Sequence, residues 1–229
     1  MNDAEDRQPH IRSFVLRAGR ITAAQQRALE ELAPRFELTR ESARLDFDRI
    51  FGRLAPRSLE IGFGNGENLA ALAAVHPERD YLGVEVHRPG VGHLFLLAEQ
   101  QALTNLRAIC RDAVEVLAQQ IPPAVLDEVL VLFPDPWPKK RHHKRRLIQP
   151  DFVALLVSRL RVGGVLRLAT DWEPYALQML EVLTTHSELR NLSPTLDYMT
   201  RDEQRLPTRF ERRGRRLGHC VRDLAFVRI

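Results

Sequence analysis

The chain has 229 residues, and its 44% hydrophobic and 28% charged residues are proportions expected of a globular protein of one domain. No apolar run reaches the ~18 residues that a membrane helix needs, and residues 1–10 are too polar for a signal peptide. Cys110 and Cys220 are too few for a metal site, so we expect no metal and interpret both as buried thiols in a reducing cytoplasm.

The chain has a net charge of +4, and the charged residues are unevenly distributed along it. Residues 139–146 contain six Lys or Arg and no acid, and residues 201–229 contain nine Arg and four acids, so the rest of the chain is acidic. Basic charge gathered in two segments indicates a directed site for a polyanion.

Alternating strand and helix patterns predict an α/β fold, a Rossmann-like doubly wound and mostly parallel sheet of seven strands. We expect a disordered N-terminus over 1–11, an arm with helices over 12–56, and the main domain over 57–229. In the arm, Thr22 and Gln25 form a capping box for a helix that ends before Pro34. Further elements are expected in this order: strand 57–62, helix 67–75, strand 80–86, helix 90–103, strand 105–110, helix 112–120, strand 126–133, a helix from Pro150 to Gly163-Gly164, strand 165–169, helix 174–186, and strands near 189–193 and 219–228.

Three glycines at alternate positions, Gly62, Gly64 and Gly66, separate the first of these strands from a helix. Glycine permits positive φ and lets a ligand approach the backbone closely. A dinucleotide site needs a later third glycine and a helix N-terminus open to pyrophosphate, whereas here Glu67 follows Gly66 at once. The acid-x-G-x-G-x-G pattern, with Glu60 as the acid, resembles motif I of S-adenosylmethionine-dependent methyltransferases. A dinucleotide enzyme and a purely structural turn remain alternatives.

Acids lie near the carboxyl ends of four strands, where open α/β sheets bind ligands. They are Glu85, Asp112, Asp135 and Asp171. Glu85 lies in an apolar run, where a carboxylate needs a partner; two ribose hydroxyls would serve, and a helix cap is the alternative. Asp112 either meets an adenine amino group or caps the following helix, and Asp171 also competes with a cap. Glu60 either binds a ligand ammonium or anchors the loop.

The strand at 126–133 leads into Pro134-Asp135-Pro136-Trp137-Pro138 and then into the basic run 139–146. Three prolines fix φ and stiffen the turn, which holds Asp135 and Trp137 at the edge of the sheet. A basic run beside a rigid turn predicts contact with nucleic acid, against the alternative of a solvated face. Trp137 either stacks on a displaced base or covers the core.

The run from Phe133 to Arg146 resembles the signature of bacterial tRNA (guanine-N7)-methyltransferases, a class I family. Pro138 and His143 depart from that family, where His and Asn are expected. The other matching segments follow in the family's order and cover most of residues 12–228: Arg12–Val15 with Arg17 and Gly19-Arg20, Leu59–Gly66, Gly83–His87, Thr170–Glu173 and Thr208–Glu211. The resemblance implies an enzyme that methylates a variable-loop guanosine of tRNA with S-adenosylmethionine, cytoplasmic and either monomeric or homodimeric.

The resemblance also implies residue roles. Cofactor binding would fall to Glu60, Gly62, Gly64, Gly66, Glu85, Asp112 and Asp135, and Asp135 would also be the active-site residue. Substrate and RNA binding would fall to Lys139, Arg141, His142, His143, Lys144, Arg145, Arg146, Asp171, Thr208, Arg209, Phe210 and Glu211.

Guanine N7 has a free lone pair and no proton to lose, so methylation there needs in-line positioning and no general base. A carboxylate such as Asp135 near the transferring methyl would stabilise the shifting positive charge. Alternatively Asp135 accepts hydrogen bonds from guanine, a role for which Asp171 and Glu211 compete. Two other classes of protein stay open. One is a methyltransferase that acts on another RNA base or on an exocyclic amine; amine methyltransferases usually carry an Asp/Asn-Pro-Pro-aromatic turn, which differs from the turn here. The other is a non-catalytic RNA-binding protein.

Overall fold

The structure is a computed structural model that describes residues 11–15, 19–38, 44–200, 211–212, 216, 218 and 220–229. Its strands are β1 (Arg57–Ile61), β2 (Asp80–Glu85), β3 (Leu106–Cys110), β4 (Leu126–Leu132), β5 (Leu160–Thr170), β6 (Leu189–Asn191) and β7 (Arg222–Arg228). Its helices are α1 (Ala23–Glu31), α2 (Ala33–Phe36), α3 (Phe47–Phe51), α4 (Glu67–Val75), α5 (Arg88–Gln100), α6 (Ala113–Gln119), the 3₁₀-helix η1 (Lys140–Arg145), α7 (Pro150–Arg159) and α8 (Glu173–Thr184).

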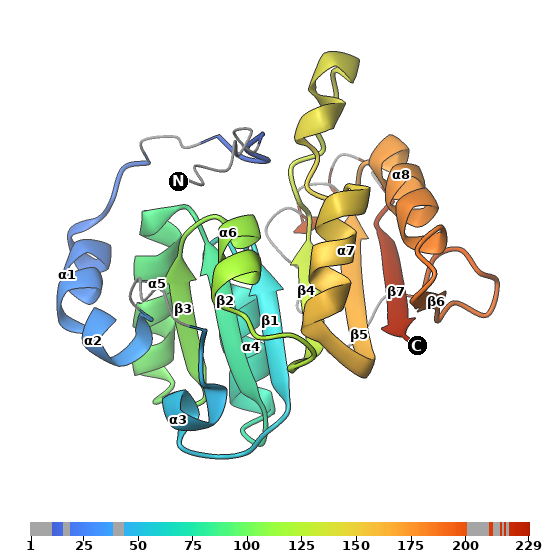
Figure 1. Ribbon diagram of the computed structural model, residues 1–229. Coiled ribbons are helices and arrows are strands. Elements are labelled where there is room, and N and C mark those ends of the chain that lie inside the picture. Colours follow the sequence, from blue (N-terminus) through green and yellow to red (C-terminus); the bar gives the residue numbers. More distant parts are fainter. Residues whose placement is uncertain are drawn as a thin grey trace, which may run out of the picture.

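The strands form one seven-stranded sheet in the order β3-β2-β1-β4-β5-β7-β6 (Figure 1). Strands β1 to β5 are parallel, and β7 runs antiparallel between β5 and β6. The predicted doubly wound, mostly parallel α/β fold is therefore confirmed. The chain builds the sheet outward from β1 toward β3 and then returns to add β4 on the other side. This reversal creates a topological switch point at the carboxyl ends of β1 and β4, where such sheets bind ligands.

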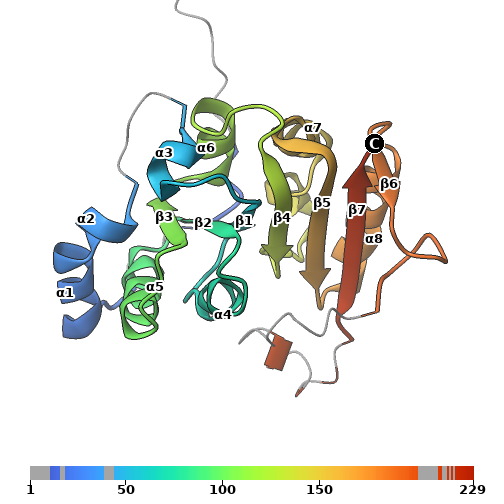
Figure 2. The same cartoon turned by 90° about the horizontal axis from the view of Figure 1, so that it is seen from below.

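Helices cover the sheet on both faces (Figure 2). One layer contains α1, α4 and α5, and its core includes Leu69, Leu94 and Phe95. The other contains α6, α7 and α8, which pack on Leu59 and Val131 among others. Strand β2 is buried along its whole length because it is covered on both faces. The Thr22–Gln25 capping box is present at the start of α1.

For most predicted elements the observed ends lie within three residues of the predicted ones, and both ends of α4 lie where they were predicted. The stop of the helix after Pro150 was placed wrongly, because α7 ends at Arg159 and β5 already begins at Leu160. The glycine pair instead lies inside β5, where the register with β4 shifts and Gly163 adopts φ +79°. The interpretation of both cysteines as buried is also wrong, because Cys220 is exposed and Cys110 only partly buried.

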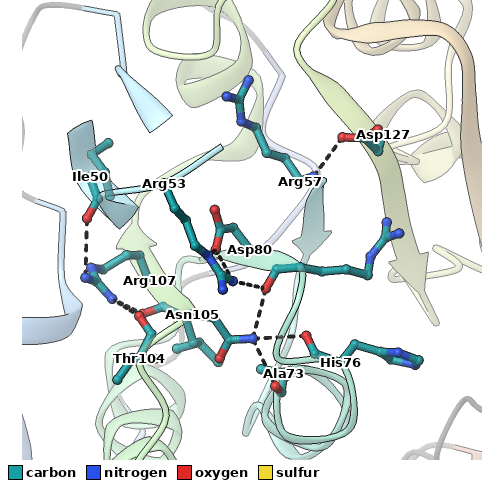
Figure 3. Close-up of polar contacts among 12 residues, drawn as sticks. Ile50, Arg53, Arg57, Ala73, His76, Asp80, Thr104, Asn105, Arg107 and Asp127 are labelled. Carbon is teal, nitrogen blue, oxygen red and sulfur yellow. Dashed lines mark hydrogen bonds and ion pairs between the residues drawn. The ribbon is translucent and has the colours of Figure 1, made fainter. Parts of the chain in front are cut away.

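A polar network closes the amino-terminal edge of the sheet (Figure 3). The Asn105 side chain donates to the carbonyl oxygens of Ala73, His76 and Arg79 at 2.9–3.2 Å. Arg53 donates to the Asp80 carboxylate, which is 2% exposed. These contacts lie at the ends where the strands begin, whereas the glycine loop and the turn after β4 follow the carboxyl ends of β1 and β4 at the opposite edge.

Candidate active site

A cavity of about 610 Å³ lies at the carboxyl edge of the parallel strands. This volume is in the range of small-molecule sites. Five segments line it: Gly62 and Gly64, Val84–His87, Arg111–Ala113, Leu132–Pro138, and Ser13–Val15 from the N-terminal segment, together with Ile61 and Leu147. The cavity therefore combines the glycine loop, the proline turn and three of the four predicted strand-end acids, Glu85, Asp112 and Asp135.

The glycine loop needs its glycines for backbone conformation. Gly62, Gly64 and Gly66 have φ of +73°, +60° and +76°, the left-handed region that other residues seldom adopt. A Cβ at Gly62 or Gly64 would meet no atom within 4 Å, whereas one at Gly66 would lie 2.6 Å from Leu94 on α5. The loop thus leaves open space toward the cavity and packs tightly toward the helix.

Helix α5 supports this loop through a glycine that sequence reasoning missed. A Cβ at Gly90 would lie 2.1 Å from the Gly64 carbonyl oxygen, so only glycine permits this approach. Close by, His93 Nδ1 lies 2.8 Å from the Asn65 carbonyl oxygen. The sequence signal was Pro89-Gly90 at a helix start, which alone does not show what the helix approaches.

Glu85 ties the end of β2 to the glycine loop. One carboxylate oxygen accepts from Gly64 N at 2.8 Å, and the other accepts from Val86 N and His87 N at 2.7 and 2.9 Å. The side chain, in a residue only 8% exposed, thereby obtains the partners that a buried carboxylate requires. A carboxylate can accept about four hydrogen bonds, so capacity remains for a hydroxyl in the cavity.

Glu60 and Asp112, two further predicted cofactor acids, differ in position. Glu60 is 2% exposed, accepts from Asn68 Nδ2 of α4 at 3.1 Å and does not line the cavity. This position favours the anchoring alternative for Glu60. Asp112 lines the cavity and also caps α6, because its Oδ1 accepts from Val114 N at 2.9 Å. The two alternatives for Asp112 are therefore compatible.

The turn after β4 is strained at both ends. Phe133 and Trp137 have φ of +53° and +44°, values that cost energy for bulky residues and persist only where surrounding contacts enforce them. Phe133 N donates to the Ala169 carbonyl oxygen at 2.7 Å. Between the two strained residues, Asp135 is exposed and lines the cavity.

Trp137 joins the turn to the N-terminal segment and to the basic run. Its Nε1 donates to the Ser13 carbonyl oxygen at 2.9 Å. The Arg145 guanidinium lies 4.9 Å from its ring centroid, and His142 meets the ring edge-on at 5.8 Å. Trp137 thus holds Ser13–Val15 against the cavity, a position compatible with covering or with stacking.

The basic run forms η1, which rises above α7 (Figure 1) and follows directly on the cavity-lining turn 132–138. Lys139, Lys140, Arg141 and Lys144 are exposed. Arg146 is different, because it is 3% exposed. The expectation that Arg146 lies along RNA does not fit this burial, since a phosphate could not reach its guanidinium.

The pKa of His142 in the same run is lowered below the usual histidine value. Partial desolvation is the largest cause, and the neighbouring cations, Arg141 and Arg145 first, add to it.

Comparison with known proteins shows the family of this chain. A family model described as "Putative methyltransferase" matches residues 55–224. A tRNA (guanine-N(7)-)-methyltransferase of Alkalilimnicola ehrlichii is 57% identical over 226 residues, which cover 98% of this chain and 95% of that protein. The chain belongs to this methyltransferase family. The protein of the same name from Thiobacillus denitrificans is 56% identical over 220 residues, 96% of each chain.

Solved structures show the methyltransferase fold. The 16S rRNA methyltransferase KamB aligns with a TM-score of 0.56 at 17% identity, over 85% of this chain and 99% of that one. An rRNA methylase from Streptococcus thermophilus aligns with a TM-score of 0.52 at 14% identity, over 76% and 87% of the two chains. At these identities the likeness concerns the fold alone.

The described residues of the remaining family motifs lie around the same edge. Asp171 follows β5 and is partly buried. The N-cap of α8 is the next residue, Trp172, which forms no side-chain cap hydrogen bond. Glu211 is fully buried, and the adjacent Arg212 donates to Glu67 at the start of α4 at 3.1 Å. Thr208, Arg209 and Phe210 lie outside the described residues.

Among the residues that the structure describes, no cluster of three or more His, Cys, Asp or Glu could hold a metal ion. In the same part of the chain, no helix is both long and apolar enough to span a bilayer.

Proposed function

We propose that this chain transfers the methyl group of S-adenosylmethionine to N7 of a variable-loop guanine in tRNA and so forms 7-methylguanosine. One observation carries the proposal: the glycine loop and the Pro134-Asp135-Pro136 turn line one cavity, and the exposed cations of η1 continue directly from that turn. A methyl-donor site and a phosphate-binding surface are thereby adjacent. The names of the relatives support the same activity.

The cavity fits S-adenosylmethionine better than a phosphate-bearing cofactor. Its charged lining includes Glu85 and Asp112, which suit a cationic ligand with hydroxyl groups. Arg111 also lines the cavity, but Glu115 and Gln119 accept hydrogen bonds from its guanidinium at 2.7 Å. When bound, the cofactor supplies an electrophilic methyl group on a sulfonium. Glu85 would hold ribose hydroxyls, Asp112 the adenine amino group, and Gly62 and Gly64 the close backbone approach.

Asp135 is proposed to act on the transfer itself. Guanine N7 carries no proton, so the protein's tasks are alignment and electrostatic stabilisation of the charge that moves onto the purine. Asp135 lies on the cavity wall in a turn whose φ values are fixed by Pro134 and Pro136. A preorganised carboxylate of this kind stabilises the transition state without reorganising during the reaction.

The exposed cations Lys139, Lys140, Arg141 and Lys144 are proposed to bind tRNA phosphates. Arg145, stacked on Trp137, carries charge to the same edge. A tRNA substrate would place the enzyme in the cytoplasm.

Nucleoside analysis tests this function. The protein is incubated with methyl-labelled S-adenosylmethionine and an unmodified tRNA transcript, and the digested RNA is separated by liquid chromatography with mass detection. We expect label in 7-methylguanosine, with Asp135→Ala as the negative control. Label in N2-methylguanosine or another nucleoside would instead indicate an exocyclic amine or a different base. Bound tRNA without any label would indicate a non-catalytic RNA-binding protein.

A further inference from the structure

Arg146 is a buried cation without an acidic partner. It is 3% exposed, and in the described part of the chain no carboxylate forms an ion pair with it. Removing a guanidinium from water is costly unless its donors are satisfied. The contacts that satisfy them therefore indicate what the residue holds in place.

Each part of the guanidinium has a defined partner. Nε donates to the Pro136 carbonyl oxygen at 2.9 Å, and Nη1 donates to Gln178 Oε1 at 2.5 Å. Nη2 lies 3.2 Å from His143 Nε2. The guanidinium also stacks 4.8 Å from the centroid of the Tyr175 ring. Arg146 thus connects the proline turn with α8.

The α8 side of this connection is firm. Tyr175 is fully buried and accepts from Ile148 N at 3.1 Å, while Gln178 Nε2 donates to the Ile148 carbonyl oxygen at 3.2 Å. The Pro136 side is the strained one, because its carbonyl belongs to the peptide that links Pro136 to Trp137, where φ is +44°. A hydrogen bond from a buried guanidinium to this carbonyl restrains the peptide that follows Asp135.

We infer that Arg146 is a positioning residue for methyl transfer: it anchors the Pro136–Trp137 peptide to α8 and so holds Asp135 toward the cavity. This inference rests on the proposed function. It separates Arg146 from the neighbouring cations, since Lys144 and Arg141 face solvent and Arg146 faces the turn. It also gives this segment two tasks, because η1, whose cations are proposed to contact RNA, is followed directly by its C-cap Arg146, which contacts the active-site turn.

The test compares Arg146→Met with two control variants. Lys144→Met removes an exposed cation of η1, two residues before Arg146. Arg228→Met removes another arginine that donates to main-chain carbonyls, those of Val157 and Leu160, away from the cavity on β7. Single-turnover rates are measured at saturating tRNA and cofactor, and tRNA Kd is measured at several salt concentrations.

Arg146→Met should lower the single-turnover rate on the order of 10²-fold, the loss that follows a displacement of about 1 Å at a reacting centre. Its tRNA Kd and salt dependence should match wild type. Lys144→Met should raise the tRNA Kd and reduce the salt slope by about one phosphate contact. Arg228→Met should lower Tm and leave the rate at the wild-type value, which controls for a loss of general stability.

A second readout does not require activity. The chain has two tryptophans, so a Trp172→Phe background leaves Trp137 as the only one. In that background Arg146→Met should shift the Trp137 emission and increase its quenching by acrylamide, because the turn loosens. Arg228→Met should change neither. If wild type forms no 7-methylguanosine, the proposed function fails, and this fluorescence still tests whether Arg146 fixes the turn.

Two results would overturn the inference. A wild-type rate and unchanged Trp137 emission in Arg146→Met would show that the turn holds its shape without this contact. A raised tRNA Kd with a reduced salt slope would show that Arg146 is a phosphate contact. If Arg146→Met does not fold, Gln178→Leu removes the α8 acceptor and keeps the arginine; a reduced rate is then expected, and an unchanged rate contradicts the inference.

Discussion

The glycine loop and the proline turn line the same cavity and reach positive φ in opposite ways. In the loop the left-handed positions are Gly62, Gly64 and Gly66, for which this conformation carries no steric strain. In the turn they are Phe133 and Trp137, which adopt it at a cost. The loop is shaped by its own residues, whereas the turn must be held by the rest of the molecule.

The contacts that hold the two regions differ accordingly. The loop is held from β2 and α5, by Glu85 and by the close approach of Gly90. The turn is held by residues far apart in the chain: Ser13 contacts Trp137, and Arg146 contacts Pro136. We therefore expect changes in the loop to act first on cofactor affinity, and changes in the turn to act first on the rate of transfer.

Asp135→Ala should give the largest effect. The single-turnover rate should fall on the order of 10²–10³-fold, as when one preorganised electrostatic group is removed. The tRNA Kd should change little, because the phosphate contacts remain. Rapid-quench measurement of 7-methylguanosine at saturating substrates isolates this step.

Asp135→Asn sharpens the result, because it keeps the shape and one acceptor oxygen and removes the charge. If the single-turnover rate of Asp135→Asn falls as far as that of Asp135→Ala, the charge of Asp135 stabilises the transition state. If much of the rate is retained, Asp135 acts mainly by accepting one hydrogen bond. Full activity in Asp135→Ala would exclude the residue from the mechanism and leave Asp171 as the next candidate.

Gly90→Ala should weaken the loop from outside. Its Cβ would lie 2.1 Å from the Gly64 carbonyl oxygen, a backbone atom that cannot rotate aside, and overpacking of this kind costs about 1–3 kcal/mol. Calorimetry should show S-adenosylhomocysteine affinity reduced by roughly 10–100-fold at that cost. The single-turnover rate at saturating cofactor should be affected less than in Asp135→Ala.

Gly52→Ala provides the matched control for Gly90→Ala. Gly52 has φ +71° at the end of α3, and a Cβ added there would meet no atom within 4 Å. Alanine there should lower Tm through left-handed strain of roughly 1–2 kcal/mol and leave cofactor affinity unchanged. Equal affinity losses in both variants would mean that general destabilisation, and not the α5 contact, controls the loop.

The comparison also explains which parts of the site could be predicted from sequence. Strand, glycines and helix follow one another locally, so the β1–α4 loop and the strand-end acids were identified from pattern alone. The partners of Trp137 and Glu85 were not, because Ser13 lies 124 residues from Trp137 and the Gly64 amide 21 residues from Glu85. No local periodicity encodes such contacts.

Arg146 illustrates the same limit within one short run. In sequence it is the last of six cations, indistinguishable in type from Lys144 and Arg145. Its difference arises because it immediately precedes Leu147 and Ile148, and Ile148 is fully buried. The apolar residues that follow were the one available signal, and they become decisive only when α8 is known to lie beside them.

Neutralising exposed cations should leave both regions intact. Lys140→Met, Arg141→Met and Lys144→Met together should raise the tRNA Kd and flatten its salt dependence by about 0.7–0.9 of a log unit for each lost phosphate contact. Cofactor affinity should stay at the wild-type value, since none of the three lines the cavity. Fluorescence titration with tRNA at several salt concentrations measures the slope, and an unaltered slope would identify the run as a solvated face.

The smallest effect is expected from His142, which meets Trp137 edge-on within the basic run. Desolvation and nearby cations lower the pKa of His142 below the usual histidine pKa of about 6.5. The ring is therefore mostly neutral at pH 7 and gains its proton only at lower pH. His142→Gln should therefore leave the tRNA Kd at pH 7.0–8.5 within about twofold of wild type, because no charge is removed there. At pH values well below 6.5 the wild-type protein should bind tRNA more tightly than the variant, because protonated His142 adds a cation beside the phosphates. Titrations of both proteins at constant ionic strength test this. An affinity advantage of wild type that already develops between pH 8 and 7 would mean that His142 is charged in that range, and the Trp137 contact would then hold a cation against the turn.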